Sequence, residues 1–342
     1  MIYLISPKKR QHKANLHCHS VLSDGCKTPS ELKEMYKSHG YSILAITDHE
    51  RPANHTELSD EEFIMLTGYE NYIRPDPEGR YNRYNKEVHL NLFARDPDNV
   101  KIICYNEKCC KYVKRDGALD TLVRAGSERP REFTREYINE FIKTARDNGY
   151  LVAYNHPYWS MEDEADILSH DGIFSLEICN YGSYIINALE HCAPLYDKML
   201  TAGKRIFCHA ADDNHNTHPE GSPLCDSFGA FTMIIPNEFT YGGIIGAMEC
   251  GDMYASMGPT ISSLSVDGDN LHIDCSEVSR IFVYFGSKRP EFILAENGEA
   301  LTSADVKIDP EARYLRVGIV DKDGKWANTR GYSREEIGLN KN

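Results

Sequence analysis

The sequence lacks the features of membrane proteins, secreted proteins and thiolate zinc knuckles. No apolar run approaches the ~20 residues that a membrane helix needs. The first residues, MIYLISPKKRQH, place basic side chains after the apolar stretch, whereas a signal peptide places them before it. The 11 cysteines include no CxxC pair, and their odd number argues against a disulfide framework. We therefore expect a cytoplasmic protein with reduced thiols and no membrane partner.

Basic residues are also fewer than acidic ones. The 342 residues contain 38 Lys+Arg and 52 Asp+Glu, which gives a formal net charge of −14. Such a chain repels a long nucleic acid unless local cations intervene, so we expect no partner of that kind. A composition of 41% hydrophobic and 26% charged residues is that of a globular protein, and the length fits two domains or a barrel-sized domain with an appendage.

Short apolar runs alternate with longer segments between about residues 15 and 257, as in repeated βα units. The runs predict strands at 42–46, 63–66, 88–93, 150–154, 174–178 and 205–208. Thr28-Pro29 is typical of a helix start, and Gly40 is typical of its end. Helical spacing recurs over 137–146 and 186–200, where Pro194 is expected to break or kink the second helix.

After Gly258-Pro259 the pattern changes to short alternating runs separated by turn residues. Strands are predicted at 261–266, 271–275, 280–285 and 314–320. We therefore predict an α/β domain over 1–257 and a small antiparallel, β-sandwich-like domain over 258–342. Residues 95–134 fit neither pattern, because they are rich in Lys, Arg and Cys, and we interpret them as a surface insertion or lid.

Two histidines give the first chemical signal. His17 and His19 project to the same face of an extended chain, so both could bind one cation. This pair alone is a weak signal, but further His, Asp and Glu side chains follow or lie within five predicted strands. They are Asp48 and His49, Glu70, His89, His156, and Asp212, Asp213 and His215. Parallel α/β proteins carry their chemistry at the C-terminal ends of strands.

Imidazole and carboxylate ligands without paired thiolates favour zinc, manganese or iron. With Asp24 from Ser23-Asp24-Gly25 added, and with Asp48 and Asp212 left out, nine candidate ligands are present, which is too many for one ion. We therefore predict two or three divalent metal ions in a hydrolytic centre.

These residues, in this order, resemble the motifs of the PHP (polymerase and histidinol phosphatase) superfamily of metal-dependent phosphoesterases. The motifs are His17-x-His19, Ser23-Asp24-Gly25, Thr47-Asp48-His49, Gly68-x-Glu70, His89, Asn155-His156-Pro157 and Asp213-x-His215, over roughly residues 13–257. Tyr254-Ala255-Ser256-x-Gly258-Pro259 and the β region after it resemble two-domain bacterial members, some of which are grouped with the CehA/McbA metallohydrolases. The resemblance implies a distorted (β/α)7 barrel.

The resemblance also implies a role for each ligand. One metal would be held by His17, His19, Glu70 and Asp213. Glu70 would bridge to a second metal held by His89 and His156, while Asp24, His49 and His215 would hold a third. A hydroxide that bridges the first two metals would attack phosphorus, and the third metal would neutralise charge on the phosphate. Glu177 resembles a family position that supports a metal ligand.

Two further side chains are weaker catalytic candidates. Asp48 and its neighbour His49 point to opposite faces of a strand, so we expect Asp48 to orient a histidine or to cap the next helix. His209, like Asp212 and His218, could act as a general acid, contact the substrate or lie in a solvated loop.

Two segments bear on substrate binding. Residues 71–81 are a turn-rich loop that we expect to lie over the site. The insertion adds Arg115, Arg124, Arg129 and Arg131, each of which could bind a phosphate or belong to a solvated basic surface.

The sequence therefore predicts a hydrolase that cleaves phosphomonoester or phosphodiester bonds of a small molecule, with nucleotides among the candidates. The CehA/McbA resemblance leaves ester, amide or carbamate hydrolysis open as an alternative. A third interpretation is a non-catalytic metal-binding scaffold, for which loss of ligands would be the expected mark; none of the nine is missing.

Overall fold

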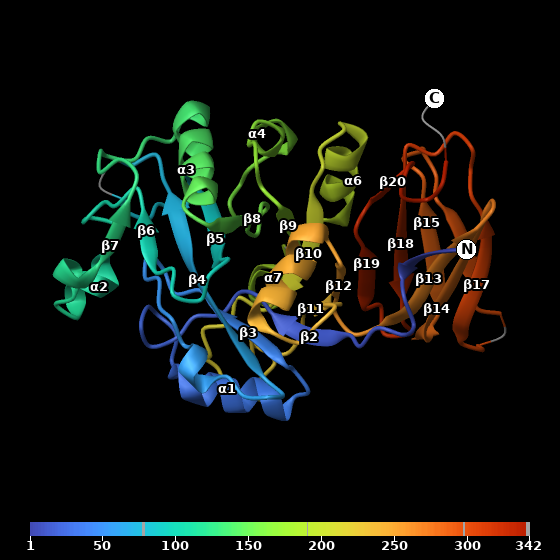
Figure 1. Cartoon of the computed structure of the whole chain (residues 1–342), viewed down its shortest axis with the longest axis horizontal. Coiled ribbons are helices and arrows are strands. Elements are labelled where there is room, and N and C mark those ends of the chain that lie inside the picture. The colour runs from blue at the N-terminus through green and yellow to red at the C-terminus, as the bar shows by residue number, and fades with distance from the viewer. Residues whose placement is uncertain (77–78, 190, 297, 340–342) are drawn as a thin grey trace.

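A large mixed sheet, with helices packed along it, leads into an antiparallel β region at the C-terminus (Figure 1). The computed structural model describes residues 1–76, 79–189, 191–296 and 298–339. The large sheet has the strand order β10-β9-β8-β5-β4-β3-β2-β11-β12-β19-β18-β15-β16, and β20 pairs with β18. A second sheet has the order β1-β13-β14-β17, and β6 and β7 form a third.

The first half of the large sheet contains the strands predicted before residue 257. These are β3 (Ile43–Ile46), β4 (Ile64–Ile73), β5 (Val88–Ala94), β8 (Tyr150–Tyr154), β9 (Ser175–Asn180) and β10 (Phe207–Ala211). It also contains β2 (His12–Asn15), β11 (Phe231–Ile234) and β12 (Met253–Ser256), which were not among the predicted strands. Strand β4 continues to Ile73 and so includes three residues that were expected in a loop. Pro77 and Glu78 of that loop lie outside the described residues.

Helices connect these strands. They are α1 (Pro29–Ser38), α3 (Arg135–Asp147), α4 (Glu164–Leu168), α5 (Tyr181–Asn187), α6 (Ala193–Thr201) and α7 (Tyr241–Cys250), with a 3₁₀ turn at Thr56–Leu58. Thr28 and Glu31 form a capping box at the start of α1, as the sequence indicated for Thr28. The helix predicted over 186–200 is instead two helices, and Pro194 lies in the first turn of α6, where its missing N–H costs nothing.

The C-terminal region contains β13 (Ile261–Asp267), β14 (Asn270–Val278), β15 (Arg280–Tyr284), β16 (Glu291–Leu294), β17 (Leu301–Lys307), β18 (Tyr314–Val320), β19 (Trp326–Thr329) and β20 (Tyr332–Ser333). An apolar core of its own fills this region. However, β12 pairs with β19, and the N-terminal strand β1 (Ile2–Ile5) pairs with β13. The sheet thus crosses residue 257, and the division into 1–257 and 258–342 stays a prediction.

The named strand pairs follow an open path, so closure into the expected (β/α)7 barrel stays a prediction. Strand β5 is antiparallel to both β4 and β8, which interrupts the parallel order. The two ends of the β10-to-β2 run meet beyond the strands. There the backbone N–H of His19 donates to Asn214 O at 3.0 Å, and that of Asp213 donates to His17 O at 2.9 Å.

Residues 95–134, which we call the insertion, form a small unit at the edge of the molecule away from the C-terminal region (Figure 1). The unit contains β6 (Lys101–Ile103), α2 (Lys111–Arg115), a 3₁₀ turn at Leu119–Thr121 and β7 (Val123–Ala125). It packs on α3, whose residues Tyr137, Ile138, Phe141, Ile142 and Ala145 form one buried face.

All 11 cysteines are free, and most of them are buried among apolar side chains. In the described part of the chain, no helix has both the length and the apolar character that crossing a membrane requires.

Candidate metal centre

The nine residues predicted as metal ligands converge at one end of the strands β2, β3, β4, β8 and β10. Seven of them line a cavity of about 510 Å³: Asp24, His49, Glu70, His89, His156, Asp213 and His215. His17 and His19 are fully buried beneath it. The strand ends therefore meet as the sequence pattern indicated.

One part of the centre is built around His17. Its Nε2 lies 3.3 Å from Glu70 Oε1 and 3.1 Å from Asp213 Oδ1, and Asp213 Oδ1 lies 3.0 Å from His19 Nε2. His156 Nε2 approaches Glu70 Oε1 to 3.3 Å. Two overlapping triads have their potential ligand atoms within 4.8 Å of one another. One consists of His17, Glu70 and His156, and the other of His17, His19 and Asp213.

A second part of the centre is closer to solvent. His19, Asp24, His49 and His215 bring their potential ligand atoms within 4.8 Å of one another. Oxygen atoms of Asp24 lie 3.6 Å from both His49 Nε2 and His215 Nε2. The imidazole of His19 lies between the two parts, with ring centroids 4.4 Å from His49 and 4.3 Å from His215.

His89 reaches the same place by a different route. It is the second residue of β5 rather than a residue after a strand. Because β5 is antiparallel to β4 and β8, its beginning lies beside their C-terminal ends, and His89 is paired with Tyr72 of β4. Its Nδ1 lies 3.0 Å from Glu70 Oε1.

The backbone at the centre is unusual for residues with side chains. The φ angles are 53° at Asp213, 23° at His156 and 52° at Glu50, next to His49. Non-glycine residues with positive φ are uncommon and cluster at functional sites, where the surrounding contacts hold them. Gly25, next to Asp24, is required for packing, because a Cβ there would lie 2.2 Å from the carbonyl oxygen of His19.

The side-chain chemistry fits a bound cation. Six buried ring nitrogens of the described residues have no hydrogen-bond partner, and three of them belong to the centre: His17 Nε2, His19 Nε2 and His49 Nδ1. A buried polar atom without a partner is costly, and metal ions would satisfy these three. Imidazole and carboxylate together are ligands of the kind that zinc, manganese and iron accept.

Charge points to the same conclusion. Burial opposes ionisation of Glu70 and Asp213, but the imidazoles around them outweigh it and hold the pKa of both carboxyls well below the usual range. Burial and then the neighbouring His215 and His49 lower the pKa of His19, which favours the neutral ring that a metal ligand needs. Buried carboxylates require compensating positive charge, which divalent cations would supply.

Three carboxylates outside the ligand set support predicted ligands. Glu177 Oε1 lies 3.1 Å from His17 Nδ1, as the predicted supporting position requires. Glu87 Oε2 lies 3.3 Å from His89 Nε2, on the ring edge opposite Glu70. Asp48 accepts hydrogen bonds from the hydroxyls of Ser20 and Ser23, and Ser23 Oγ lies 3.4 Å from His19 Nδ1. Such contacts leave the other ring nitrogen of each histidine for a metal.

The two weaker catalytic candidates, Asp48 and His209, are not among the residues that line the cavity. Asp48 contacts no histidine directly in the described structure, but anchors the loop that carries Asp24 through Ser20 and Ser23. His209 is fully buried, bonds through Nδ1 to Ser175 Oγ and lies behind Glu177 rather than in the cavity, so it cannot contact a substrate. Asp212 accepts backbone hydrogen bonds from residues 228–230 and has a structural role.

Other cavity-lining side chains were not singled out by the sequence. Trp159 packs its ring against His89 and His156, with centroid distances of 5.3 and 4.9 Å. Lys111 of the insertion also lines the cavity. Tyr81 of the predicted loop lies opposite Trp159, with centroids 6.3 Å apart, so the described part of that loop does border the site. A lone aromatic or lysine carries no sequence signal for such a role.

The four arginines of the insertion make different contacts, and none of them lines the cavity. Arg131 is buried and paired with Glu50. Arg115 donates to backbone carbonyls of the loop that carries Asp24. Arg124 and Arg129 form ion pairs within the insertion and with α3.

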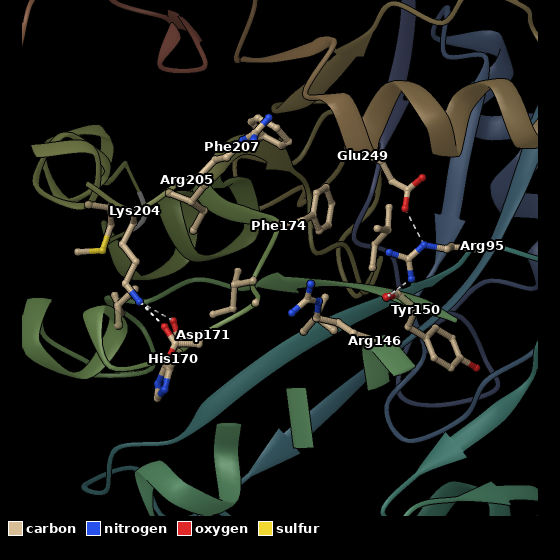
Figure 2. A pocket seen from close by; sticks show the side chains of 17 residues that line it. Arg95, Arg146, Tyr150, His170, Asp171, Phe174, Lys204, Arg205, Phe207 and Glu249 are labelled. Carbon is tan, nitrogen blue, oxygen red and sulfur yellow. Dashed lines mark hydrogen bonds and ion pairs between the residues drawn. The ribbon is translucent and has the colours of Figure 1, made fainter. Parts of the chain in front are cut away.

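A separate cavity of about 410 Å³ lies at the opposite ends of β8, β9 and β10 (Figure 2). Its lining contains none of the nine predicted ligands among the described residues. Figure 2 shows Arg95 paired with Glu249 and Lys204 paired with Asp171 at its rim. The three groups of potential metal ligands found among the described residues lie at the first cavity.

No protein-family model matches the chain, and no curated protein matches it. Among solved structures, the chain is similar to a two-domain protein of Bacteroides vulgatus that contains a predicted PHP-like metal-dependent phosphoesterase. The two are 12% identical with a TM-score of 0.45, and the match covers 97% of this chain and 89% of that one. A protein of Bifidobacterium adolescentis assigned to the metal-dependent phosphoesterases is 18% identical with a TM-score of 0.38, covering 63% and 92%. An amidohydrolase of Chromobacterium violaceum is 17% identical with a TM-score of 0.39, covering 62% and 93%.

Proposed function

We propose that the chain is a metal-dependent hydrolase of the PHP type, which cleaves phosphomonoester or phosphodiester bonds of a small molecule. The observation that carries this proposal is the set of nine imidazole and carboxylate side chains in PHP motif order, which converge around one cavity with three unpartnered ring nitrogens. The distorted (β/α)7 barrel, the trinuclear site and a cytoplasmic location are parts of the same proposal.

The ligand assignment follows the contacts. His17, His19, Glu70 and Asp213 would hold one ion, and Glu70, His89 and His156 would hold a second. Asp24, His49 and His215 would hold a third ion. Divalent ions in such a centre lower the pKa of water and neutralise phosphate oxygens.

The chain's own residues would bind and orient the substrate. The cavity volume of about 510 Å³ suits a small molecule. Lys111 and Arg74 are cations that line the cavity. Arg74 forms an ion pair with Glu87 and lies 4.0 Å from the centre of the Tyr72 ring. These two cations favour an anionic substrate in a chain of net charge −14. Trp159 covers one side of His89 and His156 and excludes water there.

The first experiment measures metal content per chain on gently purified protein and assays p-nitrophenyl phosphate, bis-p-nitrophenyl phosphate and p-nitrophenyl acetate on the same sample. Two or three ions per chain with release of p-nitrophenol from a phosphoester support the proposal. Turnover of the acetate alone favours the carboxyl-ester alternative, and metal binding without any turnover favours the scaffold. No bound metal after reloading contradicts the ligand assignment.

Variants separate a catalytic centre from a structural one. His17→Ala and Asp213→Ala should abolish metal binding at the buried positions and lower activity far more than stability, because they remove ligands. His272→Ala is the matched control, since this histidine lies on the exposed C-terminal sheet beside Asp305 and Asp274. Equal loss of folding and activity in the two ligand variants would point to a structural metal site.

A further inference from the structure

The insertion contacts the solvent-side part of the metal centre through named side chains. Tyr112 of α2 donates its hydroxyl hydrogen to Asp24 Oδ2 at 2.9 Å. The same carboxylate faces the imidazoles of His19, His49 and His215 at 3.6 to 3.8 Å. One insertion residue thus holds a predicted ligand directly.

Asp24 is the predicted ligand that most needs such support. Its side chain is 37% exposed, whereas that of Glu70 is 1% exposed. It lies in the turn between β2 and α1, outside any strand, so no sheet hydrogen bonds fix it. An exposed carboxylate in a turn has many rotamers, and ordering one costs free energy when a metal binds.

A second insertion residue holds the backbone of this turn. The guanidinium of Arg115 donates to the carbonyl oxygens of Ser23 at 3.2 Å and Val21 at 3.1 Å. Its neighbour Asp116 pairs with Arg51, two residues after His49. The insertion therefore binds two of the three chain segments that supply ligands to the solvent-side part, those of Asp24 and His49.

The contacts are selective. The ligands of the buried part, His17, Glu70, His156 and Asp213, are held by Glu177, Asn155 and Asn180, and in the described structure no insertion side chain forms a hydrogen bond or ion pair with them. The hydrogen bond from the insertion to a predicted ligand reaches Asp24 of the solvent-side part.

We propose that Tyr112, with Arg115, is a positioning residue for Asp24, and that the insertion thereby sets the affinity of the solvent-side metal position independently of the buried ones. This inference rests on the proposed function, because it requires that the centre binds metal. Residues that hydrogen-bond to a metal ligand typically change metal affinity 10-fold to 100-fold when removed.

The test uses the full chain, stripped of metal and titrated with Zn²⁺ against a competing chelator. In Tyr112→Phe, which removes only the hydroxyl, we expect the weakest zinc ion to bind about 10-fold less tightly while the tighter ions are unchanged. Arg115→Ala should shift the same ion in the same direction. Tyr105→Phe and Arg124→Ala are matched controls in the insertion, because Arg124 lies over the Tyr105 ring and pairs with Glu128, away from Asp24. Both controls should reproduce the wild-type isotherm.

Thermal unfolding of the metal-free variants separates positioning from a structural role. Tyr112→Phe should unfold at the wild-type temperature without metal and gain less from added Zn²⁺. The inference is overturned if its isotherm coincides with the wild type, or if all zinc ions weaken together with a lower metal-free unfolding temperature. If the wild type binds no zinc, the proposed function fails and this inference fails with it.

Discussion

Nδ1 of His17 lies 3.1 Å from Oε1 of Glu177, and both side chains are fully buried. The second oxygen of Glu177 accepts hydrogen bonds from the backbone N–H of His156 at 2.9 Å and from Asn180 Nδ2 at 3.0 Å. Asn180 also donates to Asp213 Oδ2 at 3.0 Å. One carboxylate of β9 thus orients three predicted ligands that come from three other segments of the chain.

This arrangement predicts the effect of Glu177→Ala. The variant should bind its tightest Zn²⁺ ion about 10-fold to 100-fold more weakly, because the His17 ring loses the acceptor that fixes its orientation. Glu177→Gln keeps an acceptor oxygen without the charge and should lose less. Zinc titration against a chelator measures both.

The matched control for that prediction is Glu162→Ala. Glu162 is also a buried carboxylate that contacts a histidine, His170, at 3.2 Å, but it lies outside the centre. It should lower stability without changing zinc affinity. An equal effect of Glu162→Ala and Glu177→Ala on the zinc isotherm would contradict the supporting role.

The sequence could predict the candidate ligands because their signal is local. His17 and His19 lie two residues apart just after β2, and His49, Glu70 and His156 each lie where an apolar run ends. Parallel strands bring such positions to one edge of a sheet, so the expectation needed no knowledge of distant contacts. The predicted strands and the start of α1 at Thr28 follow from equally local patterns.

What the sequence could not predict depends on contacts between residues far apart. The antiparallel direction of β5 is not encoded in its apolar run, although it is what brings His89 to the site. Tyr112 and Asp24 are 88 positions apart. The pairing of β1 with β13 joins the N-terminal strand to the first strand after residue 258, and an alternating pattern does not specify the partner of a strand. Asp48 reaches His19 only through the hydroxyl of Ser23, a connection that the sequence could not specify.

The buried ion pair of Arg131 and Glu50 predicts a large stability effect. Both side chains are almost inaccessible, and Arg131 also donates to the carbonyl oxygen of Tyr72 at 2.6 Å. Arg131→Met leaves the Glu50 carboxylate buried without its cation and should lower the free energy of unfolding by about 3–5 kcal/mol. Urea unfolding of the metal-free protein measures this change.

A double variant tests the cause of that loss. Glu50→Gln combined with Arg131→Met should recover much of it, because no uncompensated charge then remains. Arg129→Met is the control, since Arg129 makes exposed ion pairs with Glu132 and Glu140 that are worth about 1 kcal/mol or less. A double variant as unstable as Arg131→Met would indicate that lost packing, rather than charge, causes the effect.

Substitution of Gly25 is expected to affect the turn that carries Asp24 and not the rest of the fold. A Cβ at this position would lie 2.2 Å from the carbonyl oxygen of His19, so Gly25→Ala must displace the backbone beside Asp24. We expect loss of the weakest zinc ion and a fall in activity with a smaller fall in unfolding temperature. Gly242→Ala in α7 is the control, because a Cβ there meets nothing within 4 Å. Wild-type zinc binding by Gly25→Ala would show that the turn does not position a ligand.

His12, which lies away from the metal centre, is expected to make the folded protein less stable at acid pH. Its ring stacks on Phe239 at 4.1 Å, and burial, followed by the charge of Arg10, lowers the pKa of His12 from 6.5 to about 4. The unfolded chain therefore binds a proton between pH 6.5 and pH 4 that the folded chain does not bind, so folding loses free energy as the pH falls through this window. We expect a contribution of about 1 kcal/mol between pH 7.5 and pH 5, allowing for the water that reaches the ring.

Urea unfolding with EDTA at the two pH values measures this contribution, and His12→Asn should lose less stability on acidification than the wild type. His272 gives the opposite sign: its hydrogen bond to Asp305 raises its pKa, so it stabilises the fold below pH 6.5 and loses that effect as the pH rises through the raised value. His272→Asn should accordingly lose more stability than the wild type on acidification. If the two variants shift in the same direction, the acid sensitivity does not arise from the local environments of these rings.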